Sequence, residues 1–446
     1  MFKTYTIKNY KNIGPLDSRL FVVLFFIIYY LIIFVPMGLA VVDMIAARTP
    51  FFTIIGRSLA LFAYSVFCMQ VILGSRIKVL DRVFGLDRIL RFHRRMAIIG
   101  LFAIAVHPLA LVFEYGVHEI FLSIDNIYII CGKLAFLILI IGVAFALFRA
   151  KIKLDYNKWH TFHKLMLIII LLGFVHSMNL GSSLETGAMR NYWWVLTAIP
   201  IAVFIFKNSI GFIQRNKFQV VEVKKENHNV WTLDMTPVNS DIFKYRPGQF
   251  MFLTLKRPGY RPEEHPFTIS SAPTENEYIS ATIKKSGDYT STIGKTKPGD
   301  IARISGPYGR FSYVYNEPSS FVFIAGGVGI TPLMSMMRFI RNTDDGRPVI
   351  LLYANKAEDD IIFLDEFVEF PQNFEVVHIL SQSSKDWLGE VGHVEMGIIE
   401  KYCAKVLDSA HFYLCGPKPM MDSVHNILTE IGIDHSRIHS EVFRLN

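Results

Sequence analysis

The chain has 446 residues, of which 52% are hydrophobic and 19% are charged, and its formal net charge is +8. A soluble protein usually carries about 25% charged residues, so this composition excludes a disordered, collagen-like or small disulfide-stapled chain and indicates membrane segments. The four cysteines form no Cys-x-x-Cys pair, which argues against a structural zinc site. Long apolar runs lie before residue 210, whereas residues 218–446 have the strand and turn pattern of a soluble protein.

The first half is predicted to cross the membrane six times. A membrane span needs about 20 mostly apolar residues. Such segments occur at roughly 20–42, 58–75, 96–114, 128–148, 164–180 and 192–210.

Basic residues indicate which loops face the cytoplasm. Lys and Arg are frequent in the N-terminal segment and in loops 76–95 and 149–164, whereas loop 114–127 has acidic residues and no Lys or Arg. We therefore expect a multi-pass protein of the plasma membrane whose two termini and soluble half are cytoplasmic. This topology accounts for the basic loops, and no nucleic-acid binding is expected.

Four histidines lie on two of the predicted spans. His93 and His107 are 14 residues apart on the third span, and His163 and His176 are 13 residues apart on the fifth. Each pair is separated by about 20 Å along its helix, so each span contributes one histidine at each of two levels. A single intramembrane histidine more often makes a hydrogen bond within a bundle, but two matched levels predict two bis-histidine haem sites.

The spacing on the fifth span does not fit a straight helix. At about 100° per residue, 14 residues return to within about 40° of one face, whereas 13 residues end about 140° away. The fifth span is therefore expected to bend, to bulge or to present its histidines on different sides, and Gly173 is the residue that could permit an irregularity.

Residues 218–316 are predicted to form a small antiparallel barrel, because short apolar strands alternate with turns. Within them, a run of apolar and hydroxyl residues has a pattern that can line a flavin: His265-Pro266-Phe267-Thr268-Ile269-Ser270-Ser271. Gly287 and Thr290 lie further on, where small and hydroxyl residues open a helix. The free N–H groups of such a helix start would suit a pyrophosphate.

Residues 317–446 are predicted to form a parallel α/β domain. The strand 321–325 leads into a glycine turn and a helix, which is typical of a dinucleotide-phosphate cradle, in the run Gly326-Gly327-Val328-Gly329-Ile330-Thr331-Pro332. The last strand leads into Cys415-Gly416-Pro417, at a carboxyl end where ligands bind.

The residues after strand Phe374–Leu380 bear on the choice of nucleotide. Ser381 and Lys385 could receive a 2′-phosphate, but the segment has no Arg. We therefore expect NADPH to be preferred over NADH by less than about tenfold.

Taken together, the histidine pairs and the motifs HPFTISS, AGGVGITP and CGPKPMM resemble the NADPH oxidase and ferric reductase superfamily. The likeness is greatest to its compact bacterial members, which lack regulatory calcium-binding domains. The resemblance implies that His93 and His163 bind an inner haem b, and that His107 and His176 bind an outer haem b. It also implies contacts of the HPFTISS segment with FAD, contacts of Gly326, Gly327, Gly329 and Thr331 with the nucleotide, and a place near the nicotinamide ring for Cys415 and Gly416.

Two further residues follow from the resemblance alone. Phe443 matches the aromatic residue with which the family closes its flavin site, although three residues follow it here. Arg57 matches a position at the family's outer oxygen-reduction site. Its alternatives are a haem-propionate partner or a lipid-headgroup anchor. Animal oxidases often have a His four residues after the outer ligand, where this chain has Leu111.

We therefore expect a six-helix transmembrane haem domain (1–217), an antiparallel β-barrel FAD domain (218–316) and a parallel α/β NAD(P)-binding domain (317–446). The expected activity moves electrons from cytoplasmic NADPH or NADH through FAD and two haems to an extracytoplasmic acceptor, with Arg57, Cys415 and Phe443 as catalytic residues. Oxygen, giving superoxide, is the favoured acceptor, and a ferric chelate is the alternative. A third reading is a haem-free channel or transporter with a nucleotide-sensing domain. The sequence does not define a partner subunit.

Overall fold

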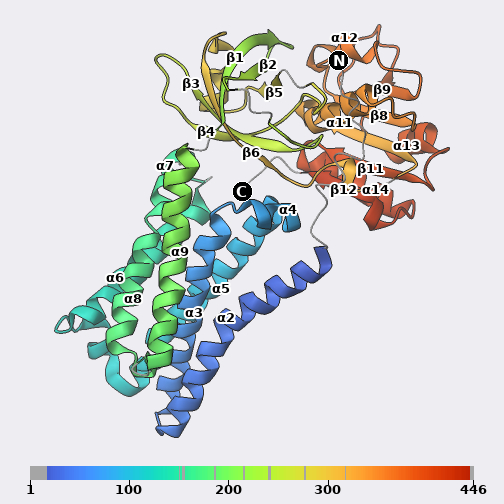
Figure 1. Ribbon diagram of the computed structural model, residues 1–446. Helices are drawn as coiled ribbons and strands as arrows, with labels where there is room; N and C mark the ends of the chain where they lie inside the picture. The colour runs from blue at the N-terminus through green and yellow to red at the C-terminus, as the bar shows by residue number, and fades with distance from the viewer. Residues whose placement is uncertain are drawn as a thin grey trace. The chain divides into compact units, whose positions relative to one another are not determined.

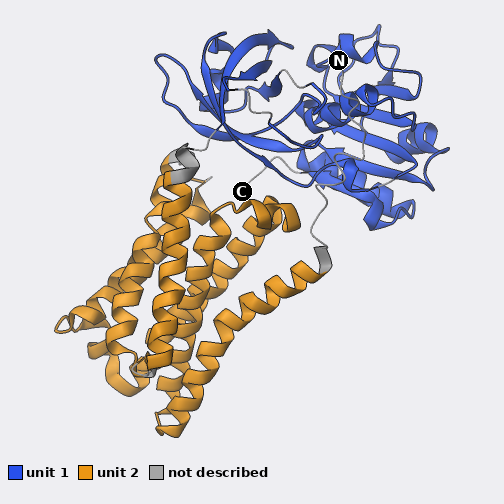
Figure 2. Cartoon of the chain, viewed as in Figure 1, with its two compact units in different colours: residues 1–14, 215–446 blue, residues 15–214 orange. Residues whose placement is uncertain are grey.

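The computed structural model describes residues 18–149, 151–152, 156–184, 187–213, 216–239, 243–275, 278–316 and 318–441. The chain divides into two compact units, one within residues 15–214 and the other containing residues 215–446 (Figure 2). Each unit is described by itself below. Phe443 lies outside the described residues.

The first unit is a bundle of long apolar helices (Figure 1). The described residues contain six segments that are long and apolar enough to span a membrane, as predicted. The helices are α2 (Ser18–Ala46), α3 (Phe51–Gly74), α4 (Lys78–Phe84), α5 (Leu86–Val117), α6 (Ile127–Phe148), α7 (Tyr156–Lys164), α8 (Leu167–Leu180) and α9 (Gly187–Ile213), with short turns at η1 (His118–Leu122) and η2 (Ser182–Leu184).

Helix α3 lies at the centre of the bundle and packs against α2, α5, α8 and α9. Its approach to α5 is close, because a Cβ atom on Gly56 would lie only 3.1 Å from the carbonyl oxygen of His107. Tyr64 in the middle of α3 stacks on Trp193 of α9, with ring centres 4.8 Å apart, and its hydroxyl is 2.8 Å from that of Thr197. The glycine at position 56 and the Tyr64–Trp193 pair therefore define how α3 packs against α5 and α9.

The fifth span is broken into two helices. The N–H groups of Leu165 and Met166 bond to carbonyls three residues earlier, on Phe162 and His163, which tightens the turn between α7 and α8. Met166 fills the space beside a residue of α6, Gly142, that has no room for a Cβ atom. The expected irregularity is therefore present, but it lies at residues 165–166.

Gly173 is not the cause of this break. It lies inside α8, where a Cβ atom would meet the ring of Tyr64 at 3.2 Å. The glycine thus serves close packing against α3, and the irregularity that Gly173 could have permitted lies at residues 165–166 instead.

The second unit begins with an antiparallel six-stranded sheet in the order β4-β3-β6-β1-β2-β5. The N–H of Ser270 bonds to the carbonyl of Ser280 at 2.9 Å, which joins the chain after β4 to β5 and closes the predicted barrel. The strands are β1 (Asn216–Lys225), β2 (Val230–Pro237), β3 (Phe250–Lys256), β4 (Glu264–Thr268), β5 (Ile279–Lys284) and β6 (Ile301–Tyr308).

A parallel six-stranded sheet follows, in the order β10-β9-β8-β7-β11-β12. Its strands are β7 (Ser320–Gly326), β8 (Val349–Asn355), β9 (Phe374–Leu380), β10 (Glu390–Val391), β11 (Ala410–Cys415) and β12 (Ile438–Glu441), with helices α11 (Ile330–Asn342), α12 (Leu364–Phe367), α13 (Met396–Cys403) and α14 (Lys418–Glu430). The chain runs outward from β7 to β10 and then returns to β11 on the other side of β7. The strand order reverses between β7 and β11, and ligands of such sheets bind at the carboxyl ends beside this point.

Candidate redox site

The four predicted histidines form two facing pairs in the membrane unit. The ring centres of His93 and His163 are 6.1 Å apart, and those of His107 and His176 are 6.3 Å apart. An imidazole nitrogen lies roughly 1.1 Å from its ring centre and bonds a metal at about 2.0 Å, so two imidazoles on opposite sides of one metal have centres about 6.2 Å apart. Both pairs therefore have the separation that one shared iron requires.

Hydrogen bonds orient the rings of the second pair. Nδ1 of His107 donates to the carbonyl of Gly56 at 2.9 Å, and Nδ1 of His176 donates to the carbonyl of Tyr128 at 2.8 Å. A carbonyl can only accept, so the proton is on Nδ1 and the lone pair is on Nε2, as a metal ligand needs. This pair thus fits a bis-histidine haem in chemistry as well as in spacing.

Close packing confines the rings of His163 and His176. The indole of Trp159 stacks on His163 with ring centres 5.2 Å apart, and the guanidinium of Arg149 lies 5.3 Å from that indole. In α6, a Cβ atom on Gly132 would lie 2.6 Å from Nδ1 of His176. Only glycine therefore leaves room for this ring at position 132.

Arg57 lies at the level of the His107–His176 pair. It directly follows Gly56, whose carbonyl accepts the hydrogen bond from His107. Its guanidinium donates to the hydroxyl of Ser182, six residues after His176. The predicted acceptor-site arginine is thus placed beside the second histidine pair.

The flavin segment divides into an accessible and a buried part. His265, Pro266 and Phe267 lie on β4 and are half-buried, and the ring of His265 stacks on Tyr289 at 4.1 Å. Thr268, also on β4, is 7% exposed.

The last three residues of this segment turn inward. Ile269 packs in the barrel core, and all three side chains are fully buried. The hydroxyl of Ser270 is 2.9 Å from that of Thr282, and that of Ser271 is 2.9 Å from that of Tyr245. Ile269 therefore packs in the barrel core, and Ser270 and Ser271 are held by hydrogen bonds to neighbouring side chains.

The predicted pyrophosphate turn is a single helical turn. Gly287 precedes α10 (Asp288–Ser291), and the hydroxyl of Thr290 accepts the N–H groups of Ser286 and Gly287 at 2.9 and 3.0 Å. Thr290 thus occupies two donors that the sequence interpretation assigned to a pyrophosphate.

The glycine loop after β7 packs directly on the end of β11. A Cβ atom on Gly329 would lie 2.2 Å from the carbonyl oxygen of Cys415, and one on Gly326 would lie 2.7 Å from Cδ of Pro417. A Cβ atom on Gly416 would in turn meet the backbone of Gly326 at 3.0 Å. Glycines therefore bring two of the predicted nucleotide motifs into close contact at the switch point of the sheet.

The flanking residues of this loop shape it from within. Gly327 has φ +52°, a conformation that side chains rarely adopt. Thr331 is 2% exposed and its hydroxyl donates to the carbonyl of Val328 at 3.0 Å, while Pro332 is buried at the start of α11. Thr331 and Pro332 thus fix the course of the loop.

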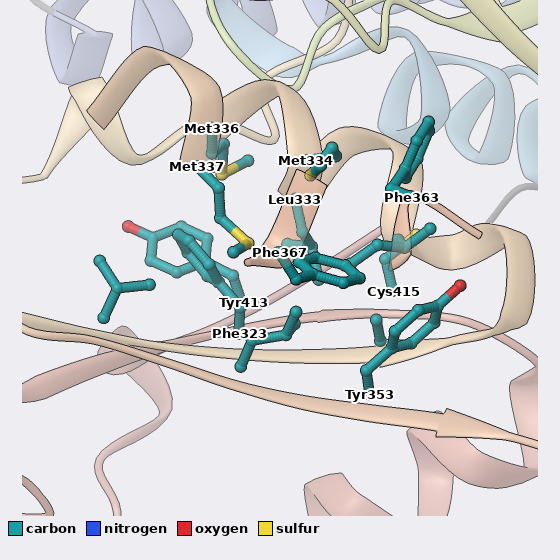
Figure 3. Close-up of a cluster of buried hydrophobic side chains, with 14 of the residues drawn as sticks. Phe323, Leu333, Met334, Met336, Met337, Tyr353, Phe363, Phe367, Tyr413 and Cys415 are labelled. Atoms are coloured by element: carbon teal, nitrogen blue, oxygen red, sulfur yellow. The ribbon is translucent and has the colours of Figure 1, made fainter. Parts of the chain in front are cut away.

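Cys415 is fully buried beneath α11, among Phe323, Tyr353 and Tyr413 (Figure 3). Burial raises the pKa of its thiol well above the usual value, and the carboxylate of Glu441 adds to this shift. A neutral, fully buried thiol does not suit a nucleophile, and the predicted place of Cys415 near the nicotinamide ring stays a prediction.

Glu441, which the sequence interpretation did not name, lies next to Cys415. It pairs in register with Cys415 across β11 and β12, and its carboxylate lies near Gly309 at the end of β6. It stands two residues before Phe443, so the C-terminal segment could have drawn attention to it.

The two residues assigned to a 2′-phosphate follow β9. The N–H of Ser381 bonds to the carbonyl of Asn355, the last residue of β8, at 3.1 Å. Lys385 is exposed four residues later. Both are therefore at the carboxyl edge of the sheet, the side on which the glycine loop lies.

Three family models match successive parts of the chain. "Ferric reductase like transmembrane component" matches residues 59–174, "FAD-binding domain" matches residues 215–312, and "Oxidoreductase NAD-binding domain" matches residues 323–426.

Individual relatives match about half of the chain. NADH-cytochrome b5 reductase 1 of Scheffersomyces stipitis is 32% identical over 225 residues, which are 48% of this chain and 78% of that protein. The reductase component of propane 2-monooxygenase from Mycolicibacterium goodii is 28% identical over 241 residues, which are 52% of this chain and 68% of that protein. Among solved structures, the flavohem-like FAD/NAD-binding domain of nitric oxide dioxygenase from Vibrio cholerae O1 biovar El Tor is 24% identical, with a TM-score of 0.46, covering 51% of this chain and 98% of that chain.

The order of a ferric-reductase-like membrane part, a FAD-binding part and a NAD-binding part agrees with the six apolar spans and the two sheets of the fold. The chain is an integral membrane oxidoreductase, and it belongs to the NADPH oxidase and ferric reductase superfamily.

Proposed function

We propose that this oxidoreductase moves electrons from cytoplasmic NAD(P)H through FAD and two b-type haems to an acceptor on the other side of the membrane. The observation that carries the proposal is the pair of histidine–histidine separations, 6.1 and 6.3 Å, at two levels of one bundle. When bound, FAD takes a hydride, which is two electrons and one proton, and leaves NAD(P)⁺, whereas haem iron carries single electrons.

The soluble unit binds and orients the reductant in this proposal. Gly326, Gly329 and Gly416 let the loop after β7 pack on the end of β11, and we place the nucleotide at this loop and the flavin at β4. The matched relatives include a reductase component and an NADH-cytochrome b5 reductase, so their names support a reductase role for the soluble half.

The membrane unit would hold the haems by histidine alone. His93 with His163, and His107 with His176, would each hold one haem iron through two imidazole nitrogens, so the iron would not bind the acceptor directly. An acceptor would therefore react at the edge of the site, where Arg57 lies beside His107.

Oxygen is the acceptor that we favour. One-electron reduction gives neutral oxygen a negative charge, and a fixed guanidinium stabilises that charge as it develops. Arg57 is held in place by Ser182 and is therefore preorganised for this role.

A ferric chelate is the second candidate. The family model that matches residues 59–174 is a ferric-reductase-like component. Leu111, which takes the place of a histidine found in animal oxidases, packs on Gly56 with its Cδ2 atom 3.1 Å from where a Cβ would lie. With leucine at this position, the acceptor side has one polar group fewer than in those oxidases.

The orientation follows from the basic loops and from counting spans. The basic loops 76–95 and 149–164 contain His93 and His163, and β1 of the soluble unit starts three residues after α9 ends. Six spans return the chain to its starting side, so we place both termini, the soluble unit and the His93–His163 pair in or facing the cytoplasm.

A spectroscopic and kinetic experiment tests this function. The purified protein should give a pyridine haemochrome of two haems b per chain and should oxidise NADPH with oxygen or ferric citrate as the only acceptor. The faster acceptor identifies the activity, and NADPH should exceed NADH in kcat/KM by less than about tenfold. Absence of haem would refute the proposal and leave the channel or transporter reading.

A further inference from the structure

The helix that follows the glycine loop is tied to the chain that follows the flavin strand. Helix α11 begins at Ile330, directly after Gly329. Five residues into it, the hydroxyl of Ser335 donates to the carbonyl of Ser271 at 2.6 Å and accepts the N–H of Gly248 at 3.3 Å. One turn later, Arg338 donates to the carbonyl of Ser270 at 2.8 Å. One helix of the nucleotide domain thus binds two backbone segments of the barrel.

A second element of the nucleotide domain, helix α12, holds Arg338 in position. Its Nε and Nη2 groups donate to the two carboxylate oxygens of Glu366 at 2.8 and 2.6 Å, a bidentate pair whose side chains are only 12% and 21% exposed. The guanidinium also lies 4.9 Å from the ring centre of Phe363, which is labelled beside the α11 cluster in Figure 3. This fixed, planar geometry directs the remaining nitrogen, Nη1, to Ser270.

Glu366 keeps its charge at neutral pH. Burial opposes ionisation of this carboxyl, but the hydrogen bonds and charge of Arg338 outweigh burial, and the pKa of Glu366 lies below its usual value. Removing either partner would leave a buried charge without its counter-ion, which is costly.

The barrel also fits against α11 without a gap. Gly248 has φ +88°, and a Cβ atom there would lie 2.3 Å from the carbonyl oxygen of Phe311 and 2.4 Å from Cε of Met336 on α11. The loop before β3 is therefore pressed against the helix that carries Ser335.

We propose that Ser335, Arg338 and Glu366, here called the α11 clamp, are positioning residues that set the distance between the bound nicotinamide and the bound flavin. The clamp connects Gly329, six residues before Ser335, with Thr268, two residues before Ser270. Hydride transfer needs reacting atoms about 3–3.5 Å apart, and a misplacement of about 1 Å can cost about 10²-fold in rate. This inference rests on the proposed function of the soluble unit.

The test uses the full-length protein in detergent with the variants Arg338→Met and Ser335→Ala. The matched control is Arg341→Met, because Arg341 also contacts Glu366, at 3.3 Å, and otherwise reaches Asn342 and the ring of Phe370. Anaerobic stopped flow measures FAD reduction by NADPH per bound FAD, together with the isotope effect of deuterated NADPH. Hydrogen–deuterium exchange of residues 268–275 is measured without nucleotide.

We expect Arg338→Met to slow the hydride step by about 10- to 100-fold, with the Kd for NADPH and the FAD content changed less than twofold. Ser335→Ala should slow it less, Arg338→Lys should recover part of the rate, and Arg341→Met should stay within twofold of wild type. Exchange at 268–275 should rise in Arg338→Met and remain unchanged in Arg341→Met.

An unchanged hydride rate per bound FAD in Arg338→Met would overturn the clamp, as would equal slowing by Arg341→Met. If the wild-type protein does not reduce FAD with NADPH, the proposed function fails. The exchange measurement then still decides whether the clamp holds the barrel segment, because unchanged exchange in Arg338→Met would refute it independently.

Discussion

At the scale of single residues, the carbonyl hydrogen bonds of His107 and His176 separate the second histidine pair from ordinary membrane histidines. A histidine that only stabilised the bundle would use either ring nitrogen. Here Nδ1 is committed to a backbone carbonyl on each ring, which leaves Nε2 of both rings for the space between them.

We expect His107→Ala to reduce haem from about two to about one per chain, because a bis-histidine haem needs both ligands. FAD reduction by NADPH should continue, while electron transfer to the outer acceptor should stop. The pyridine haemochrome assay measures the haem, and His118→Ala, which changes an exposed histidine of η1, is the control. Two haems in the His107→Ala protein would contradict the assignment.

Arg57 gives a prediction that separates the two acceptors. We expect Arg57→Ala to slow oxygen reduction by about 10²–10³-fold and to affect ferric citrate reduction less, because oxygen acquires its charge only on reduction. Arg57→Lys, which keeps the charge, should retain more of the oxygen rate. Equal slowing with both acceptors, at full haem content, would favour the metal reductase. A fall in haem content would instead make Arg57 a structural residue.

At the scale of helices, glycines decide where the spans can approach the ligands. Gly132 of α6 faces the ring of His176, whereas Gly38 of α2 has no heavy atom within 4 Å of a built Cβ. Both glycines lie within helices, so replacing either one with alanine has a similar effect on helix propensity. A difference between the two variants therefore reports the contact of residue 132 with His176.

We expect Gly132→Ala to displace His176 and to disturb the outer haem, since the added Cβ would lie 2.6 Å from Nδ1. Gly38→Ala should be neutral or slightly stabilising, because alanine is favoured over glycine within a helix by about 0.5–1 kcal/mol. Low-temperature optical and EPR spectra of the low-spin haems measure the difference. Identical spectra of the two variants would show that the ring is not confined by α6.

Periodicity and motif order predicted most elements but not the local geometry. Apolar run length gave the six spans, and strand alternation gave both sheets. The break at residues 165–166 carries no proline or glycine, so the sequence did not mark it, and in the structure Met166 packs there against Gly142.

The sequence likewise predicted some features of the candidate site and missed others. Ligand types and their spacing identified the histidine pairs. Hydroxyls suit a flavin, so Ser270 and Ser271 stay predicted flavin contacts, but the sequence did not indicate that both are fully buried and bonded to Thr282 and Tyr245. The Arg338–Glu366 pair joins residues 28 apart in the sequence, and no local pattern marks which charges will meet in the folded domain.

At the scale of the whole molecule, the chain consists of two compact units, each with its own hydrophobic core. The barrel and the nucleotide domain belong to the same unit and share the contacts of α11 (Figure 2). The flavin and nucleotide functions are therefore expected to separate together from the membrane part.

We expect a fragment of residues 217–446 to be soluble and to reduce an artificial dye with NADPH when FAD is added. It should contain no haem, because all four histidine ligands lie in the other unit. Dye reduction followed spectrophotometrically, with and without added FAD, measures this. A folded fragment that never oxidises NADPH in the presence of FAD would contradict the flavin assignment.

Because the fifth span is broken between α7 and α8, its two helices can differ in their rotation about their own axes. In one unbroken helix, a rotation of the helix about its axis that turned His176 would also turn His163. With the break, α8 can rotate about its own axis without turning His163 with it. Under the proposed function, the level of His176 could therefore adapt to a new acceptor in evolution while the level of His163 stays matched to the flavin side.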